Sequence, residues 1–241
     1  MKFELHCGDA IDFLSQLPSE SVDLVNSDYA YESIEKHRKR GTTTRLKKSK
    51  ASSNAWFGVF PDARVPELMR HLFRVLRPDR HCYLWCDVET MFVLKPAAEE
   101  VGFRFWKPLI WDKMRIGMGY HYRNQLERIL FFEKGRRRLA DLSIPDILRC
   151  PPVRGGYPAE KPVEVHEVLT MQSALEDELV LDPFMGSGSA GEAALRLGCR
   201  FLGNDINPDA VESAQERLGA CRELPAPGPH RRIGQRQRSE K

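Results

Sequence analysis

Apolar and polar positions alternate along most of the chain between short buried strands and helices with one apolar face. Strand patterns fall at Lys2–Cys7, Val22–Ser27, His81–Cys86, Phe103–Trp111 and Glu127–Glu133. Helical periodicity fits Ile11–Leu17, Pro66–Leu76, Val163–Met171, Asp209–Leu218 and Glu89–Val101, the last interrupted or restarted at Pro96. Strands that alternate with helices predict an α/β fold with a mostly parallel sheet.

The stretch Leu179–Asp205 joins a strand pattern, a glycine-rich turn and a helix. An apolar run enters Asp182-Pro183-Phe184, glycines follow at 186 and 188, and residues 190–197 have helical composition. Asp205 ends a second apolar run about 20 positions after the turn, the spacing at which βαβ folds place a carboxylate on a ribose hydroxyl. This stretch predicts a Rossmann-like half-fold that binds a cofactor.

The turn indicates which cofactor it suits. It lacks the G-x-G-x-x-G pattern, and Asp182-Pro183-Phe184 separates the strand from the glycines, whereas dinucleotide loops place glycines directly after the strand, close to a pyrophosphate. A ligand with a ribose and no phosphates fits better, and S-adenosylmethionine is such a ligand. The alternatives are an ordinary strand-to-helix turn and a nicotinamide oxidoreductase on a similar half-fold.

Composition is that of a soluble globular protein, with 41% hydrophobic and 29% charged residues. No apolar run reaches the length of a membrane span, and the start, MKFELHCGD, has no signal-peptide pattern, so a cytoplasmic protein is expected. The six cysteines contain no C-x-x-C pair, which predicts buried reduced thiols and no metal site. We expect one domain over residues 1–218, with inserted loops at 32–61 and 135–160, and a basic, disordered tail over 219–241.

Basic residues are clustered although the net charge is only +3. The insertion at 32–61 carries Lys36, Arg38, Lys39, Arg40, Arg45, Lys47, Lys48 and Lys50, and the second irregular stretch carries Arg136, Arg137, Arg138 and Arg154. Such side chains suit DNA phosphates, and Tyr122, in a glycine- and aromatic-rich loop, is placed with them. The alternatives are a solvated charged loop and an aromatic turn packed on the sheet.

A carboxylate and two aromatic residues follow the strand at 22–27, in Asp28-Tyr29-Ala30-Tyr31. Ligands of open α/β sheets bind beyond the carboxyl ends of the strands, so this position favours a site. Together with Lys161-Pro162-Val163-Glu164 and residues 182–188, DPFMGSG, this tetrapeptide resembles the amino-methylating DNA methyltransferases of the permuted β group. In that group, as here, the catalytic loop precedes the cofactor loop. The resemblance covers most of residues 1–218.

The resemblance implies roles for particular residues. S-adenosylmethionine would contact Asp182 and be wrapped at its methionine part by Phe184, Gly186 and Gly188, with Lys161, Pro162 and Ser189 nearby. Asp205 would hold its ribose, and Asp9 with Ala10 would meet its adenine. Capping of the first helix is the structural alternative for Asp9.

The resemblance also implies the reaction, in which Asp28 and the carbonyl of Tyr29 accept hydrogen bonds from the amine of a flipped-out base and Tyr31 stacks on that base. Asp rather than Ser at the head of the loop favours a site-specific adenine-N6 methyltransferase, and a cytosine-N4 enzyme is the alternative. Two prolines of the family's Asp-Pro-Pro-Tyr loop are replaced here by Tyr29 and Ala30. A catalytically impaired DNA-binding protein is therefore a second alternative, since prolines stiffen the loop.

Double-stranded DNA is the partner that these features imply. The group is typical of restriction–modification systems, but the sequence specifies neither the recognition site nor a nuclease partner. A homodimer is left open.

Overall fold

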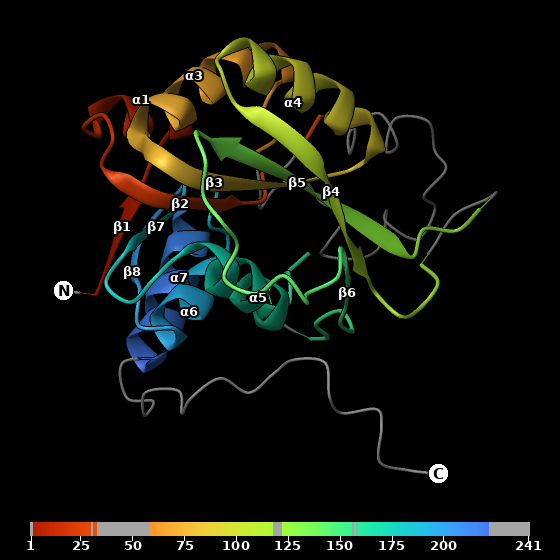
Figure 1. Ribbon diagram of the computed structural model, residues 1–241. Helices are drawn as coiled ribbons and strands as arrows, with labels where there is room; N and C mark the ends of the chain where they lie inside the picture. The colour runs from red at the N-terminus through yellow and green to blue at the C-terminus, as the bar shows by residue number, and fades with distance from the viewer. Residues whose placement is uncertain are drawn as a thin grey trace.

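The structure is a computed structural model that describes residues 2–29, 31–32, 58–117, 122–155, 157 and 159–221 (Figure 1). These residues form an eight-stranded sheet in the order β1-β8-β7-β2-β3-β5-β4-β6. The strands are β1 (Phe3–Cys7), β2 (Val22–Ser27), β3 (Leu76–Cys86), β4 (Arg104–Asp112), β5 (Leu126–Lys134), β6 (Ile147–Arg149), β7 (Leu179–Asp182) and β8 (Arg200–Asp205). The helices are α1 (Ala10–Gln16), α3 (Val65–Val75), α4 (Val88–Glu100), α5 (Val163–Ser173), α6 (Ser189–Arg196) and α7 (Pro208–Cys221), with a 3₁₀ turn, η2 (Asp62–Arg64).

Helices cover both faces of the sheet (Figure 1). On one face α1, α3 and α4 bury an apolar cluster that includes Leu14, Leu72 and Leu94. On the other face α5, α6 and α7 bury a second cluster that includes Leu169 and Leu218. The apolar positions that recur every three to four residues in the sequence are those that face these two cores.

The sheet is mostly parallel, as predicted. The pairs β1–β8, β8–β7, β7–β2, β2–β3 and β4–β6 are parallel, and only β3–β5 and β5–β4 among the described strands are antiparallel. The carboxyl ends of β1, β8, β7 and β2 therefore meet at one edge of the sheet, where open α/β folds bind ligands.

Two predicted elements differ from the structure. The helix expected to break at Pro96 runs without interruption over α4, because its buried positions Leu94, Ala97 and Ala98 stay in the core and tertiary packing outweighs the proline. The stretch 135–160, expected to be irregular, contains β6, which pairs with β4 and is itself the last strand of the sheet. Most of the predicted tail, residues 222–241, lies outside the described residues.

Three of the six cysteines, Cys82, Cys86 and Cys199, are buried free thiols as predicted, whereas Cys7 is exposed. Within the described ranges, no group of three or more His, Cys, Asp or Glu side chains could hold a metal ion. No described helix is long and apolar enough to cross a membrane.

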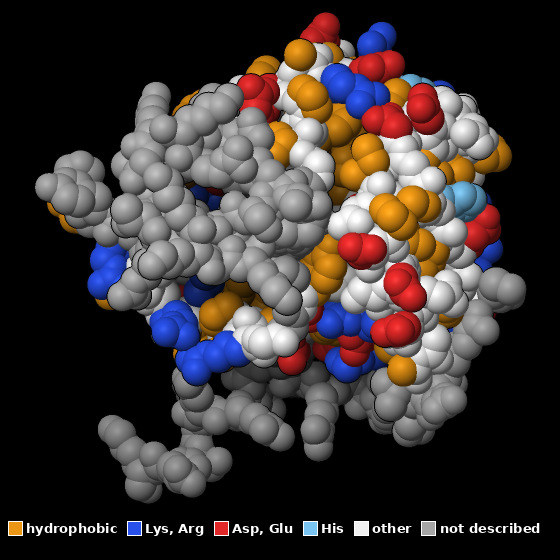
Figure 2. Space-filling model, turned by 180° about the vertical axis from the view of Figure 1, so that it is seen from behind, with side chains coloured by type: hydrophobic (Ala, Val, Ile, Leu, Met, Phe, Trp, Pro, Cys, Tyr) orange, Lys and Arg blue, Asp and Glu red, His pale blue; other side chains and the backbone are white. Residues whose placement is uncertain are grey.

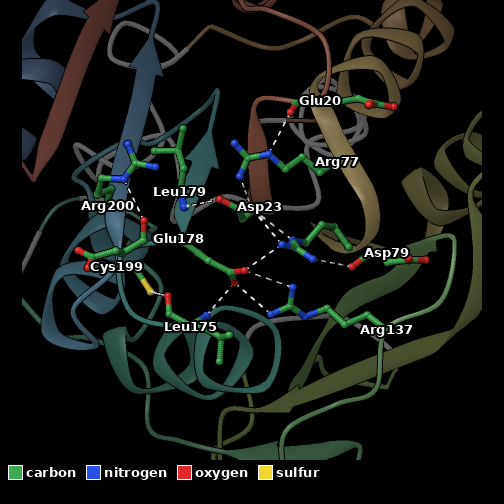
Figure 3. Close-up of polar contacts among 12 residues, drawn as sticks. Glu20, Asp23, Arg77, Asp79, Arg137, Leu175, Glu178, Leu179, Cys199 and Arg200 are labelled. Atoms are coloured by element: carbon green, nitrogen blue, oxygen red, sulfur yellow. Dashed lines mark hydrogen bonds and ion pairs between the residues drawn. The ribbon is translucent and has the colours of Figure 1, made fainter.

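A cluster of ionic contacts joins the strands near their amino ends, on the side of the sheet opposite the ligand-binding carboxyl ends (Figure 3). The buried carboxylate of Asp23 accepts hydrogen bonds from Arg77 at 2.5 Å and from the Leu179 N–H at 2.9 Å. Arg80 bridges Asp23, at 3.2 Å, and Glu178, at 2.9 Å. These contacts link β2, β3 and the start of β7.

We expect Asp23→Ala to lower the free energy of unfolding by about 3 kcal/mol, because it removes a buried carboxylate and leaves two half-buried arginines and the Leu179 N–H without their acceptor. Urea denaturation followed by circular dichroism measures this change. The matched control is Asp146→Ala, which breaks an exposed pair with Lys107 and should change the stability far less. Equal losses in the two variants would refute a structural role for the Asp23 cluster.

Candidate active site

A pocket of about 410 Å³ opens at the carboxyl ends of β1, β2, β7 and β8. It brings together most of the predicted site residues, namely Asp9, Ala10, Asp28, Tyr29, Tyr31, Lys161, Asp182, Phe184, Gly186, Ser189 and Asp205. Pro162 and Gly188 do not line it. Pro162 is the N-cap of α5, and Gly188 is the N-cap of α6. The sequence therefore predicted the position of the pocket and most of its wall.

The glycine turn follows β7 directly. Asp182, the last residue of β7, is buried and accepts hydrogen bonds from the Ser27 hydroxyl at 2.6 Å and the Phe184 N–H at 3.0 Å. Burial raises the pKa of Asp182 to about 7 in spite of these donors. Gly188 has a φ of 80°, and a Cβ there would approach Ala214 of α7 to 3.1 Å, so this position requires glycine.

Asp205, at the end of β8, is hydrogen-bonded to the glycine turn. Its carboxylate accepts the Gly186 N–H at 2.9 Å and the Asn207 N–H at 2.9 Å. Burial raises the pKa of this carboxyl group. The spacing noted in the sequence thus corresponds to a direct contact between the second strand of the unit and the turn.

Asp9 caps α1, because its carboxylate accepts the Ile11 N–H at 2.9 Å. The same carboxylate receives two hydrogen bonds from Arg64, at 2.6 and 2.8 Å, and these lower the pKa of Asp9. Arg64 also lies over the ring of Phe60. The sequence did not reveal Arg64 as a site residue, because nothing in its neighbourhood indicates an acidic partner 55 positions earlier.

Tyr29 belongs to an aromatic cluster on the pocket wall. Its ring centroid lies 5.7 Å from Tyr31, 5.7 Å from Phe60 and 5.6 Å from Phe184. Tyr29 is only 1% exposed and Tyr31 is 8% exposed, and burial raises the pKa of both phenols. The tyrosine that stands where the family has proline is therefore fixed by packing.

The two oxygens of Asp28 have different surroundings. Oδ2 lies 2.5 Å from the ammonium group of Lys161, whereas Oδ1 is buried and has no hydrogen-bond partner within the described ranges. Burial raises the pKa of Asp28, and the charge of Lys161 opposes this effect. An unpartnered acceptor on a pocket wall is costly in the free protein and suits a ligand that donates a hydrogen bond.

Lys161 also connects Asp28 to a second carboxylate. Its ammonium group lies 3.4 Å from Glu127 Oε2, and Lys113 lies 2.5 Å from Glu127 Oε1. A second cavity of about 290 Å³ adjoins the first, and both are lined by Glu127, Tyr157, Ala159, Glu160 and Lys161. In the sequence Glu127 stands out only as a strand residue, since its partners are brought near it only by the fold.

His166 lies on the pocket wall in a defined tautomer. Trp85 Nε1, which can only donate, lies 3.4 Å from Asn26 Oδ1, and His166 Nδ1 lies 3.0 Å from the same oxygen. Nδ1 must therefore carry the hydrogen, and Nε2 is an acceptor when the ring is neutral. Burial lowers the pKa of His166 to about 3, assisted by Lys161 and Arg217.

We expect the ring of His166 to remain neutral, with hydrogen on Nδ1, from neutral pH down to about pH 5. Nitrogen-15 NMR of histidine-labelled protein measures this state. Because the unfolded imidazole takes up a proton near its ordinary pKa and the folded one does not, stability falls as the pH drops from about 6.5 toward 3. Titration of His166 close to its ordinary pKa would contradict the structure.

The predicted DNA-contacting residues lie in different places. Tyr122 and Arg154 are exposed, and the neighbours of Arg154, Val153 and Gly155, line the second cavity. The eight basic residues between 36 and 50 lie outside the described residues.

The second basic stretch does not form one rim with the pocket. β5 runs antiparallel to β3, and its last residue, Lys134, pairs with Arg80 in the first half of β3. Arg136, Arg137 and Arg138 therefore follow at the end of the sheet opposite the pocket. Arg137 pairs there with Glu178 at 3.0 Å (Figure 3). Arg136, Arg137 and Arg138, which were expected to contact DNA, therefore lie away from the pocket, because the antiparallel β5 carries the chain away from the site.

Comparisons with known proteins agree with this geometry. Residues 142–216 match the family described as DNA methylase, N6_N4_Mtase. The type II methyltransferase M.HpaI of Haemophilus parainfluenzae is 24% identical over 246 residues, which cover 90% of this chain and 74% of the relative. The putative methylase YubD of Escherichia coli K12 is 27% identical over 220 residues, which cover 88% of each chain.

Solved structures show the same fold. The putative DNA modification methylase TTHA0409 of Thermus thermophilus, complexed with S-adenosyl-L-methionine, has a TM-score of 0.66 at 23% identity, covering 94% of this chain and 95% of that one. PvuII DNA methyltransferase, cytosine-N4-specific, has a TM-score of 0.70 at 16% identity, covering 93% and 87%.

The chain thus has the fold of the S-adenosylmethionine-dependent DNA methyltransferases, as predicted. The family match and the relatives support a DNA methyltransferase of the N6/N4 type. S-adenosylmethionine, the cofactor inferred from the glycine turn, is the cofactor of this class.

Proposed function

We propose that this protein transfers a methyl group from S-adenosylmethionine to the N6 amine of a flipped-out adenine in double-stranded DNA, as a permuted, β-group methyltransferase. The observation that carries the proposal is the Oδ1 atom of Asp28. It is a buried acceptor, has no partner among the described residues, and belongs to a residue on the wall of the predicted cofactor pocket.

The chemistry requires such an acceptor. An exocyclic amine is a poor nucleophile because its lone pair is delocalised into the ring, and N–H donation to Asp28 and to the Tyr29 carbonyl favours the tetrahedral form that can attack. The amine nitrogen would take the methyl group as the bond from that group to the cofactor sulfur breaks, and one amine proton would be released. Positioning and electrostatics account for such a step, with no covalent enzyme intermediate.

The pocket suits the cofactor. Asp205 offers carboxylate oxygens for ribose hydroxyls, and Gly186 and Gly8 leave open wall beside it, since a Cβ at Gly8 would meet nothing within 4 Å. Asp9 and Ala10 lie on the same wall for the adenine moiety. Asp182 and Phe184 would lie at the methionine part, and bound S-adenosylmethionine would supply the electrophilic methyl group.

Ser189 and Pro162 have more limited roles in this proposal. The Ser189 hydroxyl accepts a hydrogen bond from Arg217 at 2.9 Å and lines the pocket, so it can contact the methionine end. Pro162 and Gly188 set the starts of α5 and α6 and shape the pocket from behind its wall.

DNA is proposed to approach the pocket edge. Figure 2 shows Lys and Arg side chains grouped beside the grey residues on one face, while Asp and Glu lie mainly on the other half. The basic insertion leaves the fold after Glu32 and returns at Gly58, next to the pocket wall. Arg154, whose neighbours line the second cavity, and the exposed Tyr122 would add contacts.

Adenine is preferred to cytosine because Asp, not Ser, begins the catalytic loop. The cytosine-N4 reaction is the alternative, since a solved neighbour is named as cytosine-N4-specific. Both reactions use Asp28 as the hydrogen-bond acceptor for the amine, and they differ in the base that is methylated and so in the product.

Nucleoside mass spectrometry of unmethylated DNA, incubated with the protein and S-adenosylmethionine, tests the proposal. We expect N6-methyladenine, and we expect Asp28→Asn to lower the rate about 100-fold or more while cofactor affinity changes little, because an amide replaces one acceptor oxygen. Asp146→Asn, an exposed carboxylate, is the control.

N4-methylcytosine as the product would transfer the proposal to the alternative base. A wild-type protein that binds both cofactor and DNA yet yields no methylated nucleoside would overturn it.

A catalytically impaired DNA-binding protein is the second candidate, based on the replacement of both family prolines. The packing of Tyr29 against Tyr31, Phe60 and Phe184 argues for an active loop, because contacts supply the stiffness that proline would give.

We therefore expect the double variant Tyr29→Pro/Ala30→Pro to lose thermal stability and gain no turnover, since it removes a buried ring from the cluster. Calorimetry and single-turnover methylation measure the two effects. A large gain in turnover at unchanged DNA affinity would instead favour the impaired protein.

A further inference from the structure

Four alternating charges form a continuous chain beside the proposed reaction site. Lys113 contacts Glu127 at 2.5 Å, Glu127 contacts Lys161 at 3.4 Å, and Lys161 contacts Asp28 at 2.5 Å. Lys161 is 9% exposed, and none of the four side chains is more than 24% exposed. The charges sum to zero, which is the condition under which a group of buried ions is tolerated.

The ammonium group of Lys161 has its donors directed to the protein. Three oxygens surround Nζ: Asp28 Oδ2 at 2.5 Å, Glu127 Oε2 at 3.4 Å and the Ala159 carbonyl at 3.5 Å. Glu127 Oε2 has no hydrogen-bond partner among the described residues, so its contact with Lys161 is an ion pair without a hydrogen bond. The short contact of the ammonium group is therefore the one with Asp28.

Building on the proposed function, we propose that Lys161 and Glu127 are positioning residues that act on the reaction through Asp28. Lys161 holds Oδ2 and thereby leaves Oδ1 as the acceptor for the substrate amine. Glu127 holds Lys161 in place and is itself held by Lys113, whose ammonium group lies over the Trp111 ring.

The electrostatics give each residue a separate effect. Without Lys161, the carboxylates of Asp28 and Glu127 face each other in a buried site, and one of them takes up a proton. A protonated Asp28 has lost the charge that attracts the amine hydrogen. Without Glu127 as well, Asp28 has no repelling neighbour from β5 and can ionise again.

The other titratable groups near Asp28 come from its own loop and from neighbouring elements. They are Tyr29, Tyr31, Cys86 at the end of β3 and Asp182 at the end of β7, and burial raises the pKa of each. Asp182 titrates near neutral pH, so only differences between variants that all retain it can be assigned to Asp28.

The experiment compares full-length wild-type protein with Lys161→Met, Glu127→Gln and the double variant. It measures the pH profile of kcat on DNA and the affinity for S-adenosylmethionine by calorimetry. Lys161→Met should lower kcat about 100-fold at neutral pH and move the acid limb of the profile to higher pH by about one unit or more, because Asp28 is then protonated.

Cofactor affinity should stay within about threefold of wild type in Lys161→Met. The double variant should recover about tenfold in kcat relative to Lys161→Met, because the repelling carboxylate is gone. If Lys161 only stabilised the fold, its replacement would neither shift the acid limb of the pH profile nor allow kcat to recover in the double variant. Lys107→Met, which removes an exposed lysine from β4, is the matched control and should leave the profile unchanged.

The outcomes separate this inference from the proposed function. The wild-type protein can be active while Lys161→Met loses cofactor affinity in proportion to kcat and keeps the acid limb of its pH profile at the wild-type position. That result overturns the positioning role and leaves the proposed function intact. Failure of the double variant to recover, although its melting temperature matches that of wild type, also overturns it. A wild-type protein that makes no methylated nucleoside overturns both proposals.

Discussion

Four parallel strands end at the same edge of the sheet, and each brings a carboxylate into one pocket. Asp9 follows β1, Asp28 follows β2, Asp182 ends β7 and Asp205 ends β8. Like charges so close together would repel and raise one another's pKa values. The rest of the site therefore depends on how these four groups are separated and compensated.

Compensation takes two forms. Asp9 and Asp28 each pair with a cation, Arg64 and Lys161 respectively. Asp182 and Asp205 rely on neutral donors instead, from the Ser27 hydroxyl and from backbone N–H groups. Burial keeps the pKa of these two carboxyl groups raised, as it does for Asp28 in spite of Lys161. A positively charged ligand would complement this half of the pocket.

The sequence predicted what is encoded locally. The apolar periods located most strands and helices, and the spacing from the glycine turn to Asp205 located the pocket. Contacts made only by the fold were missed, because Glu127 and Arg64 meet partners that are distant along the chain, Lys161 and Asp9. Arg137 was misplaced for the same reason, since local charge does not reveal that β5 runs antiparallel.

The bridge between Tyr31 and Phe60 closes the base of the segment between them. Glu32 reinforces this closure by accepting the Asp62 N–H at 3.1 Å. Closing a segment between two such anchors costs only about 0.6 kcal/mol more in loop entropy for each doubling of its length. The residues between the two anchors can consequently diverge in length and sequence among descendants of this protein while the pocket wall is inherited unchanged.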